Sequence, residues 1–385
     1  MNISPAIRVA ILAAVALTGL SACSDKGKLR EPAKLTSINN PGVKLDTVWS
    51  ERLGKGADDR PSGLRPALES DALFVAETGG KVFALDPATG ARRWETASKA
   101  RIISGPTALG DLVLVGTLDA EVIAFKRADG KEAWRAKASS EVLAAPAGDG
   151  NTVVARSTDG RVYGFNSADG KRLWSFDRSE PTLTLRGLSS PVVDGNRVFI
   201  GMDNGHLACV NLATGEAIWE QVISTPNGRS ELERLTDIDA SMLSTDDGLL
   251  VASYGGDVAL VNPSDGEAKW KRAIKSDAGM ALGQGNVYVS DADGVVWALD
   301  AASGAAVWKN ESLKFRHLSP PAFFAGYAVV ADYDGYVHFL NIKDGSFAGR
   351  ERLSWHAVAA PMVASETMLY VQNLEGKLTA LRVVK

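Results

Sequence analysis

The stretch DPATGARRW, residues 86–94, recurs in degenerate form along the chain and decides how the rest of the sequence is interpreted. In it Gly90 precedes Trp94 by four residues. Five further stretches keep this spacing: RADGKEAW ending at Trp134, SADGKRLW at Trp174, LATGEAIW at Trp219, PSDGEAKW at Trp270 and AASGAAVW at Trp308. A repeat of about 40 residues indicates a solenoid or a propeller.

Within one repeat the apolar pattern predicts four short strands. They are residues 102–109 (IISGPTAL), 112–117 (LVLVGT), 121–127 (EVIAFKR) and 132–138 (EAWRAKA). The turn between the second and third strands is rich in Gly, Asp and Asn, as in TDG ending at Gly160. These residues tolerate the positive φ of tight hairpins. Such a unit is typical of a propeller blade, and each tryptophan is expected to pack against the neighbouring blade rather than to hold a cofactor.

Two irregular repeats predict how the ring closes. A seventh copy, IKDGSFAG, keeps Gly345 but has Gly349 in place of tryptophan, and an eighth ends with the chain at GKLTALRVVK. The missing strand is found at the other end, in DTVWSERL with Trp49. We therefore expect an all-β fold, an eight-bladed β-propeller of four-stranded antiparallel blades over residues 46–385. Its last blade is closed by the N-terminal strand.

The first 45 residues predict export and anchoring. Arg8 is followed by an apolar run over residues 9–20, which is too short to span a bilayer and suits a signal peptide. The segment LSAC resembles a bacterial lipobox, which predicts a signal peptide over residues 1–22 and lipidation at Cys23; the alternative is a signal cleaved without lipidation. The lipobox resemblance also implies that Ser24, directly after the cysteine, favours location of the protein at the outer membrane rather than the inner membrane. Residues 23–45 are then a flexible tether.

The charge pattern excludes some partners. The formal net charge is −4, and the 42 Lys and Arg residues are scattered without a basic run, so nucleic-acid binding is not expected. Cys209 lies in the apolar stretch HLACVNL and has no partner if Cys23 is acylated. It is therefore expected to be a buried structural thiol.

No catalytic, metal or cofactor motif is present. The four histidines fall in different repeats, without ligand-like spacing. The stretches DADG (291–294) and DYDG (332–335) resemble the start of a calcium loop but lack its downstream ligands, so they are expected to be hairpin turns. The Gly-Trp repeat resembles that of quinoprotein dehydrogenases, which bind pyrroloquinoline quinone and calcium. This is the enzyme alternative, although the adjacent cysteine pair typical of those enzymes is missing. We predict no cofactor and no catalytic residues.

Insertions between blades predict the functional surface. The spacing between successive tryptophans is longest where residues 54–63, 175–191 and 221–239 lead into blades 1, 4 and 5. Strand alternation places such links on one face of the disc, so the second and third insertions are expected to be neighbours. Their apolar, Arg and acidic residues suit a protein contact. The acids Asp237 and Asp239 could instead pair with Arg186 within the chain.

The lipobox, the tether, the eight blades and the loop stretches LTLRGLSSP (183–191) and RLTDIDA (234–240) together resemble the BamB family, the propeller lipoproteins of the outer-membrane β-barrel assembly machinery. The resemblance covers essentially the whole chain. It implies a non-enzymatic scaffold that binds the periplasmic POTRA domains of BamA and assists folding and insertion of unfolded outer-membrane proteins. Carried over by position, the BamA-binding residues are Leu183, Leu185, Arg186, Asp237 and Asp239. The implied location is the outer membrane, with the propeller in the periplasm.

Overall fold

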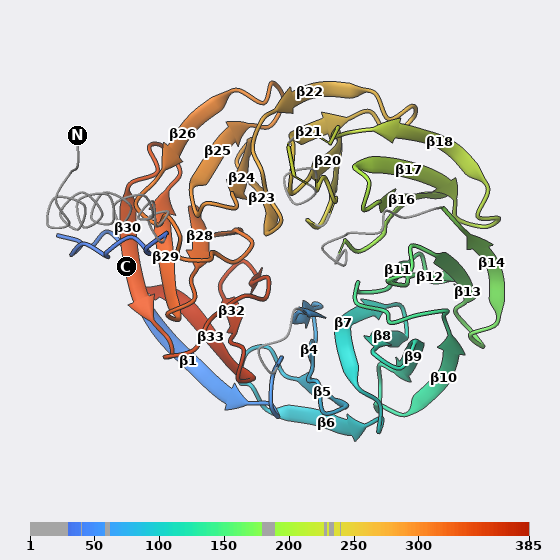
Figure 1. Ribbon diagram of the computed structural model, residues 1–385. Helices are drawn as coiled ribbons and strands as arrows, with labels where there is room; N and C mark the ends of the chain where they lie inside the picture. The colour runs from blue at the N-terminus through green and yellow to red at the C-terminus, as the bar shows by residue number, and fades with distance from the viewer. Residues whose placement is uncertain are drawn as a thin grey trace, which may run out of the picture.

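The computed structural model describes residues 30–39, 41–57, 62–178, 189–226, 229–230, 235–238 and 240–384. Every regular element among them is a β-strand. The strands form eight sheets arranged in a ring (Figure 1). Each sheet contains a four-stranded antiparallel blade that runs from the centre of the ring to its rim, so the predicted eight-bladed propeller is confirmed.

The blades follow one another around the ring in chain order, and the strands of each blade are named from the innermost to the outermost. Blades 1 to 4 comprise β3 (Ala67–Leu68), β4 (Leu73–Ala76), β5 (Lys81–Leu85), β6 (Arg92–Ala97); β7 (Ile102–Leu109), β8 (Leu112–Thr117), β9 (Glu121–Lys126), β10 (Glu132–Lys137); β11 (Ala147–Gly148), β12 (Thr152–Arg156), β13 (Val162–Asn166), β14 (Arg172–Phe176); and β15 (Val192–Asp194), β16 (Arg197–Gly201), β17 (His206–Asn211), β18 (Ala217–Val222).

Blades 5 to 8 comprise β19 (Leu243–Thr245), β20 (Gly248–Ala252), β21 (Val258–Val261), β22 (Ala268–Arg272); β23 (Gly279–Gly283), β24 (Asn286–Ser290), β25 (Val296–Asp300), β26 (Ala306–Asn310); β27 (Ala322–Phe324), β28 (Tyr327–Ala331), β29 (Tyr336–Asn341), β30 (Phe347–Arg352); and β31 (Val363–Ala364), β32 (Leu369–Gln372), β33 (Lys377–Val384), β1 (Lys44–Arg52). One additional strand, β2 (Gly63–Leu64), pairs in parallel with β7, so the sheet of blade 2 has five strands. The repeat pattern did not predict β2, because it belongs to the insertion before blade 1.

The disc has two distinct faces. The link face carries the connections from the outer strand of one blade to the inner strand of the next, such as residues 98–101 and 311–321. It also carries the hairpin turns between second and third strands. The opposite turn face carries the hairpins between third and fourth strands, such as residues 86–91.

Seven tryptophans join neighbouring blades at the turn face. Each indole Nε1–H donates to a backbone carbonyl in the third hairpin of the next blade, at 2.6–3.1 Å. Each ring lies against the repeat glycine of that hairpin, where an added Cβ would fall 2.5–2.7 Å from the nearest ring atom. The pairs are Trp49–Gly90, Trp94–Gly130, Trp134–Gly170, Trp174–Gly215, Trp219–Gly266, Trp270–Gly304 and Trp308–Gly345. The predicted packing against neighbouring blades is confirmed, and the glycine and tryptophan of one repeat serve two different interfaces.

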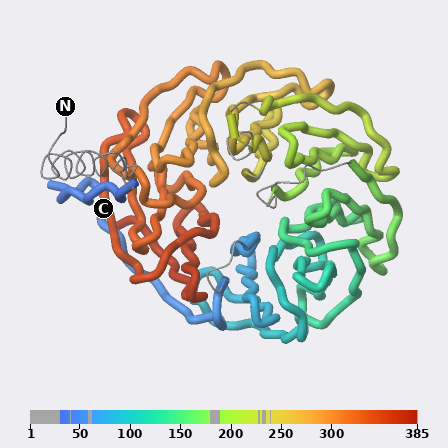
Figure 2. The backbone as a smooth tube through the Cα atoms, viewed as in Figure 1, coloured from blue at the N-terminus to red at the C-terminus, as the bar shows by residue number. Residues whose placement is uncertain are grey.

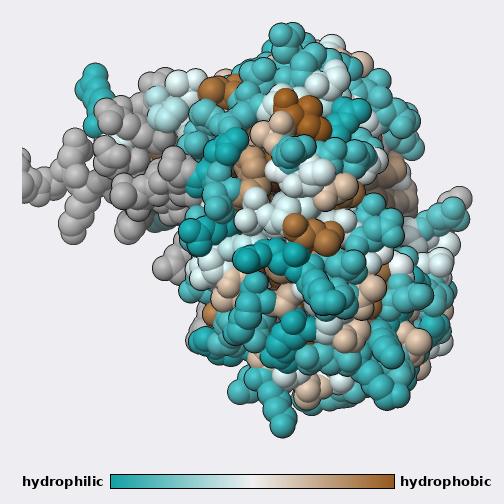
Figure 3. Space-filling model, turned by 90° about the vertical axis from the view of Figure 1, so that its right-hand side faces the viewer, coloured by the Kyte–Doolittle hydropathy of each residue, from teal (hydrophilic) through white to brown (hydrophobic). Residues whose placement is uncertain are grey.

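A β-bulge directs each tryptophan toward its neighbour. In every outer strand the register shifts at the residue before the tryptophan position, for example between Trp174 and Arg172. A bulge of this kind bends the strand and re-aims a side chain. It turns Leu173, Ile218 and Val307 outward, each about half exposed. The rim in Figure 3 accordingly shows separate apolar spots on a hydrophilic surface.

The ring closes where the two ends of the chain meet. Strand β1 pairs antiparallel with β33 from Lys44↔Val384 to Arg52↔Lys377, and the blue and red segments lie side by side in Figure 2. The interface between blades 7 and 8 has no third hairpin to receive a tryptophan, because β33 and β1 are not consecutive in the chain. Gly349 occupies the tryptophan position there and lies against Val43, whose amide donates to the Ala348 carbonyl at 3.1 Å.

The segment before β1 contacts blades 6 and 7. The Ala33 amide donates to the Lys314 carbonyl at 2.9 Å, and the Arg316 guanidinium donates back to the Ala33 carbonyl at 3.1 Å. Arg350 donates to the Thr36 carbonyl at 2.9 Å. Residues 30–45 belong to the predicted tether over residues 23–45, whose flexibility stays a prediction; the described part is hydrogen-bonded to the propeller.

The two arginines that hold this segment belong to a buried charge network in blade 7. Arg316 Nε and His338 Nε2 both contact Asp332 Oδ2, at 2.7 and 2.9 Å, and Arg350 Nε donates to His338 Nδ1 at 2.9 Å. Because an arginine Nε–H can only donate, His338 is neutral with its proton on Nε2. Burial lowers the pKa of His338. Burial opposes ionisation of Asp332 also, but the hydrogen bonds from His338 and Arg316 outweigh it and lower the pKa of Asp332.

Comparing two glycines tests the tryptophan contact. Gly170 (φ +70°) lies against Trp134, whereas Gly110 (φ +55°) has nothing within 4 Å of an added Cβ. Both alanine variants incur the cost of a left-handed conformation, about 1–2 kcal/mol. Gly170→Ala should lower the free energy of unfolding by about 1–3 kcal/mol more, because the indole must move. Urea denaturation measures both values, and equal losses would contradict a structural role for the contact.

The His338 network predicts a pH dependence of stability. The unfolded chain takes up a proton at this residue near pH 6.5, whereas the folded protein resists protonation, so stability is lost as the pH falls below about 6.5. The free energy of unfolding should drop by about 1 kcal/mol between pH 7 and 5.5 from this residue. The low pKa of Asp332 acts only at lower pH. His338→Gln can keep a donor and an acceptor without titrating and should flatten the profile in urea denaturation, whereas the exposed His317→Gln should not.

Candidate partner-docking surface

Two long links on the link face form the candidate surface. One joins β14 to β15 and the other joins β18 to β19. The Ser189 hydroxyl of the first donates to the Ala240 carbonyl of the second at 3.4 Å, and both residues are buried. The expectation that these insertions are neighbours is therefore confirmed.

Of the five predicted BamA-binding residues, one lies within the described part of the chain. Leu183, Leu185, Arg186 and Asp239 lie outside the described residues, so their roles stay predictions. Asp237 is described, and its exposed fraction is 0%. The structure therefore places one predicted acid inside the protein rather than on its surface.

Asp237 belongs to a short segment held between two blades. The Ile238 amide donates to the Met202 carbonyl of blade 4 at 3.1 Å, and the Asp237 carbonyl accepts from the Tyr254 amide of blade 5 at 3.0 Å. Residues 235–238 are all buried. The segment thus bridges the second hairpins of blades 4 and 5 with its own backbone.

Glycines in those hairpins allow the close approach. A Cβ on Gly255 would lie 1.6 Å from the Leu235 carbonyl oxygen, and one on Gly205 would lie 2.3 Å from the Ser224 oxygen. A Cβ on Gly201, at the end of β16, would meet the Ile238 side chain at 2.6 Å. Glycine is therefore required at these positions for the link to pack into the face.

A buried ion pair lies beside this segment, and the sequence reasoning missed it. Arg156, at the end of β12, pairs with Asp203 in the second hairpin of blade 4, and both side chains are at least 95% buried. Asp203 follows Met202, which binds the link. An arginine ending the otherwise apolar stretch TVVAR was the available signal, because a charge at a buried strand end needs a partner.

The expected turn chemistry of the acidic stretches is confirmed. Asp291 Oδ1 accepts from the amides of Asp293 and Val295, and Asp332 Oδ1 accepts from those of Asp334 and Tyr336. Both carboxylates are thus committed to their own hairpins. No group of three or more potential metal ligands occurs among the residues that the structure describes.

The remaining predicted features are structural. Cys209 in β17 is fully buried, so the buried position expected from the sequence is confirmed, and burial raises the pKa of its thiol to about 11. His206 and His356 contact Glu220 and Glu375, at 2.9 and 2.8 Å. Within the described ranges, no helix has the length and apolar character needed to cross a membrane.

Comparison with known proteins places the chain in a family. A family profile described as outer membrane protein assembly factor BamB matches residues 43–124, 103–310 and 292–384. The outer membrane protein assembly factor BamB of Pseudomonas aeruginosa is 42% identical over 372 residues, covering 96% of this chain and 97% of that protein.

Solved structures agree on the fold. The crystal structure of BamB from Moraxella catarrhalis superposes with a TM-score of 0.79 at 26% identity, covering 88% of this chain and all of that one. A quinohemoprotein alcohol dehydrogenase from Comamonas testosteroni gives a TM-score of 0.69 at 14% identity, covering 88% of this chain and 76% of that one. The second likeness shows a shared propeller fold alone. Together with the full-length match in sequence, these comparisons show that the chain belongs to the family of the outer membrane protein assembly factor BamB.

Proposed function

We propose that this chain is a non-enzymatic scaffold subunit of the outer-membrane protein assembly machinery, which binds the POTRA domains of BamA and assists the folding and insertion of β-barrel outer-membrane proteins. The observation that carries the proposal is the pair of long links on one face, joined by the Ser189–Ala240 hydrogen bond. Relatives over the full chain length are named assembly factors, which supports this function over the dehydrogenase alternative.

The link face suits a partner that is another protein. The rigid disc fixes where both links start and end, which lowers the entropy lost on binding. Arginine is enriched among the residues that dominate protein interfaces, and the apolar leucines beside it suit the core of the same contact. We assign direct contact with BamA to Leu183, Leu185, Arg186 and Asp239.

Asp237 has a different part in the proposal. Its side chain is fully buried, while its backbone bonds to blade 5 and its neighbour Ile238 bonds to blade 4. A buried acid in this position orients the link that carries Asp239. Asp237 is therefore proposed as a positioning residue for the surface that BamA contacts.

Charge reversal at the first link tests the partner. Arg186→Glu should abolish co-purification with BamA, because a repelled or unpaired charge at an interface costs several kcal/mol. The matched control is Arg101→Glu, which changes an exposed arginine on the same face at blades 1 and 2, paired with Asp119. It should bind normally, and both variants should keep the wild-type circular dichroism and melting temperature. Normal binding by Arg186→Glu would reject the proposed surface.

The two acids of the second link should differ in their effects. Asp239→Asn should weaken binding of BamA without changing the melting temperature, whereas Asp237→Asn should weaken binding and also lower the melting temperature.

Anchoring by a lipid is proposed from the segment LSAC, with Cys23 as the acylated residue and the propeller in the periplasm. Cys23→Ser should release the protein from the outer-membrane fraction into the soluble periplasmic fraction, because an acyl anchor supplies most of the membrane affinity. Fractionation of cells labelled with radioactive palmitate measures both changes. Ser24→Ala, which keeps the cysteine, is the control. Continued labelling of the Cys23→Ser protein would place the lipid elsewhere.

A further inference from the structure

A cavity of about 320 Å³ opens at the link-face end of the central channel. Its wall is formed by residues that lie directly before the inner strands of several blades. Arg65 precedes β3, Ser190 precedes β15, Ser241 precedes β19, Pro320 precedes β27 and Pro361 precedes β31. Together with Asp277, which precedes β23, these residues bring six blades to one partly open site, in which side chains far apart in the sequence meet.

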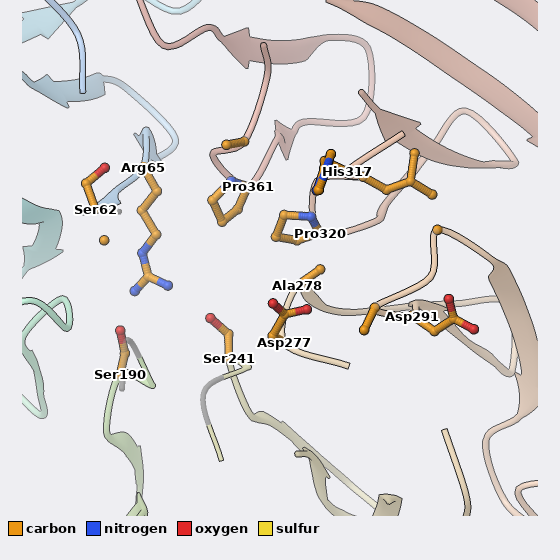
Figure 4. A pocket seen from close by; sticks show the side chains of 15 residues that line it. Ser62, Arg65, Ser190, Ser241, Asp277, Ala278, Asp291, His317, Pro320 and Pro361 are labelled. Carbon is orange, nitrogen blue, oxygen red and sulfur yellow. The ribbon is translucent and has the colours of Figure 1, made fainter. Parts of the chain in front are cut away.

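Arg65 reaches into this cavity from a rigid backbone. Its amide donates to the Gly105 carbonyl at 2.9 Å, and the preceding Leu64 pairs with Gly105 in the parallel β2–β7 ladder. Gly63 fits tightly as well, because a Cβ there would lie 2.2 Å from the Leu143 oxygen. Figure 4 shows the Arg65 side chain extending into the cavity, toward Ser190 and Ser241.

Among the described residues, no acid pairs with the guanidinium of Arg65. The two fully buried arginines of the described residues have carboxylate partners, as Arg316 has Asp332 and Arg156 has Asp203. Within the part of the chain that the structure describes, Arg65 makes no side-chain hydrogen bond and no ion pair. Burial lowers the pKa of Arg65, which reflects this unfavourable loss of hydration. An anion that entered the cavity would supply the missing partner.

The other cavity walls restrict the kind of anion. Asp277 also lines the cavity, and Asp291 is already committed to its hairpin. The negative charge of Asp277 disfavours a phosphate or another multiply charged anion, whereas a single carboxylate fits the planar fork of an arginine. Pro320 and Pro361 form an apolar wall on the side of blades 7 and 8, suited to a small apolar group.

We propose that this cavity binds a single carboxylate carried on a small apolar group, with Arg65 as the recognising residue and the hydroxyls of Ser190 and Ser241 as further donors. The carboxylate could belong to the end of an extended polypeptide or to a free organic acid; both present the same chemistry. The proposal does not depend on binding of BamA.

The test is calorimetric titration of the full chain in detergent with matched probes. They are N-acetyl-Gly-Val with a free carboxylate, the same dipeptide as a carboxamide, butyrate and inorganic phosphate. The free acid should bind at least about ten-fold more tightly than the carboxamide, because a charge-assisted bidentate contact is lost in the amide. It should also bind more tightly than phosphate. Equal binding of acid and carboxamide, or no binding of either carboxylate, would overturn the proposal.

Four variants locate the site. Arg65→Gln should weaken binding of the acid about ten-fold or more, and Arg65→Lys by less, because it keeps the charge without the fork. Asp277→Asn should strengthen binding, since it removes a repelling charge. Arg101→Gln, on the same face outside the cavity, should leave binding unchanged. The melting temperature of each variant confirms that it is folded, and wild-type affinity in a folded Arg65→Gln protein would refute the assignment.

The source of the carboxylate follows from the same titrations. Comparable affinity for butyrate and the dipeptide would identify a free acid as sufficient, whereas clear preference for the dipeptide would identify a chain end. Arg186→Glu should bind these probes as the wild type does. Loss of BamA binding and loss of carboxylate binding can therefore be observed independently.

Discussion

The contact between a tryptophan of one blade and the repeat glycine of the next is the interaction on which the ring depends. A single four-stranded blade has two apolar faces and cannot bury both by itself. The indole covers the outer part of each interface and satisfies its N–H on a backbone carbonyl of the neighbouring hairpin. A side chain at the glycine position would collide with the ring. Glycine and tryptophan must therefore change together, and the interface between blades 7 and 8 shows this: without a hairpin to receive an indole, the tryptophan is replaced by Gly349.

Because of this arrangement, the length of a link can change without affecting the indole contacts that stabilise the ring. All seven indole contacts lie at the turn face, between third hairpins and the start of outer strands. The long links lie at the opposite face. A link can therefore lengthen, as it does before blades 4 and 5, without altering an indole contact. The segment over residues 235–238 is nevertheless well packed, because glycines in two adjacent hairpins admit its backbone.

The repeat predicted the fold closely because its two fixed residues mark two structural features. The glycine marks the third hairpin of a blade, and the tryptophan four residues later marks the contact with the next blade. The four segments of the second repeat match β7 to β10 within one residue. The last repeat lacks its fourth strand, and this predicted that the N-terminal strand with Trp49 completes that blade and closes the ring. The sequence could not reveal the outer-strand bulges, which are a matter of register rather than composition. It did not reveal the pairing of Arg156 with Asp203 or of Arg316 with Asp332, since partners 47 and 16 residues apart lie on different strands or links and meet only through the packing of those elements. For the docking surface, the neighbouring links were predictable, but the burial of Asp237 was not, because alternation alone assigns no depth to a residue in a link.

A second set of contacts, close to the channel, complements the tryptophans. The hydroxyl of Ser104 donates to the Val142 carbonyl at 2.7 Å, that of Ser189 to Ala240, and that of Ser290 to the Ser319 carbonyl at 3.1 Å. Each bond crosses from one blade to the next at the inner ends of the link face. Blades that radiate from an axis lie closest together near that axis, so a short hydroxyl suffices there, whereas the wider gap at the rim needs an indole. Contacts at two radii and on opposite faces resist tilting of a blade as well as its separation from its neighbour. The link face is thus a fixed platform, on which the positions of Asp237 and Arg65 are set by the ring rather than by their own loops.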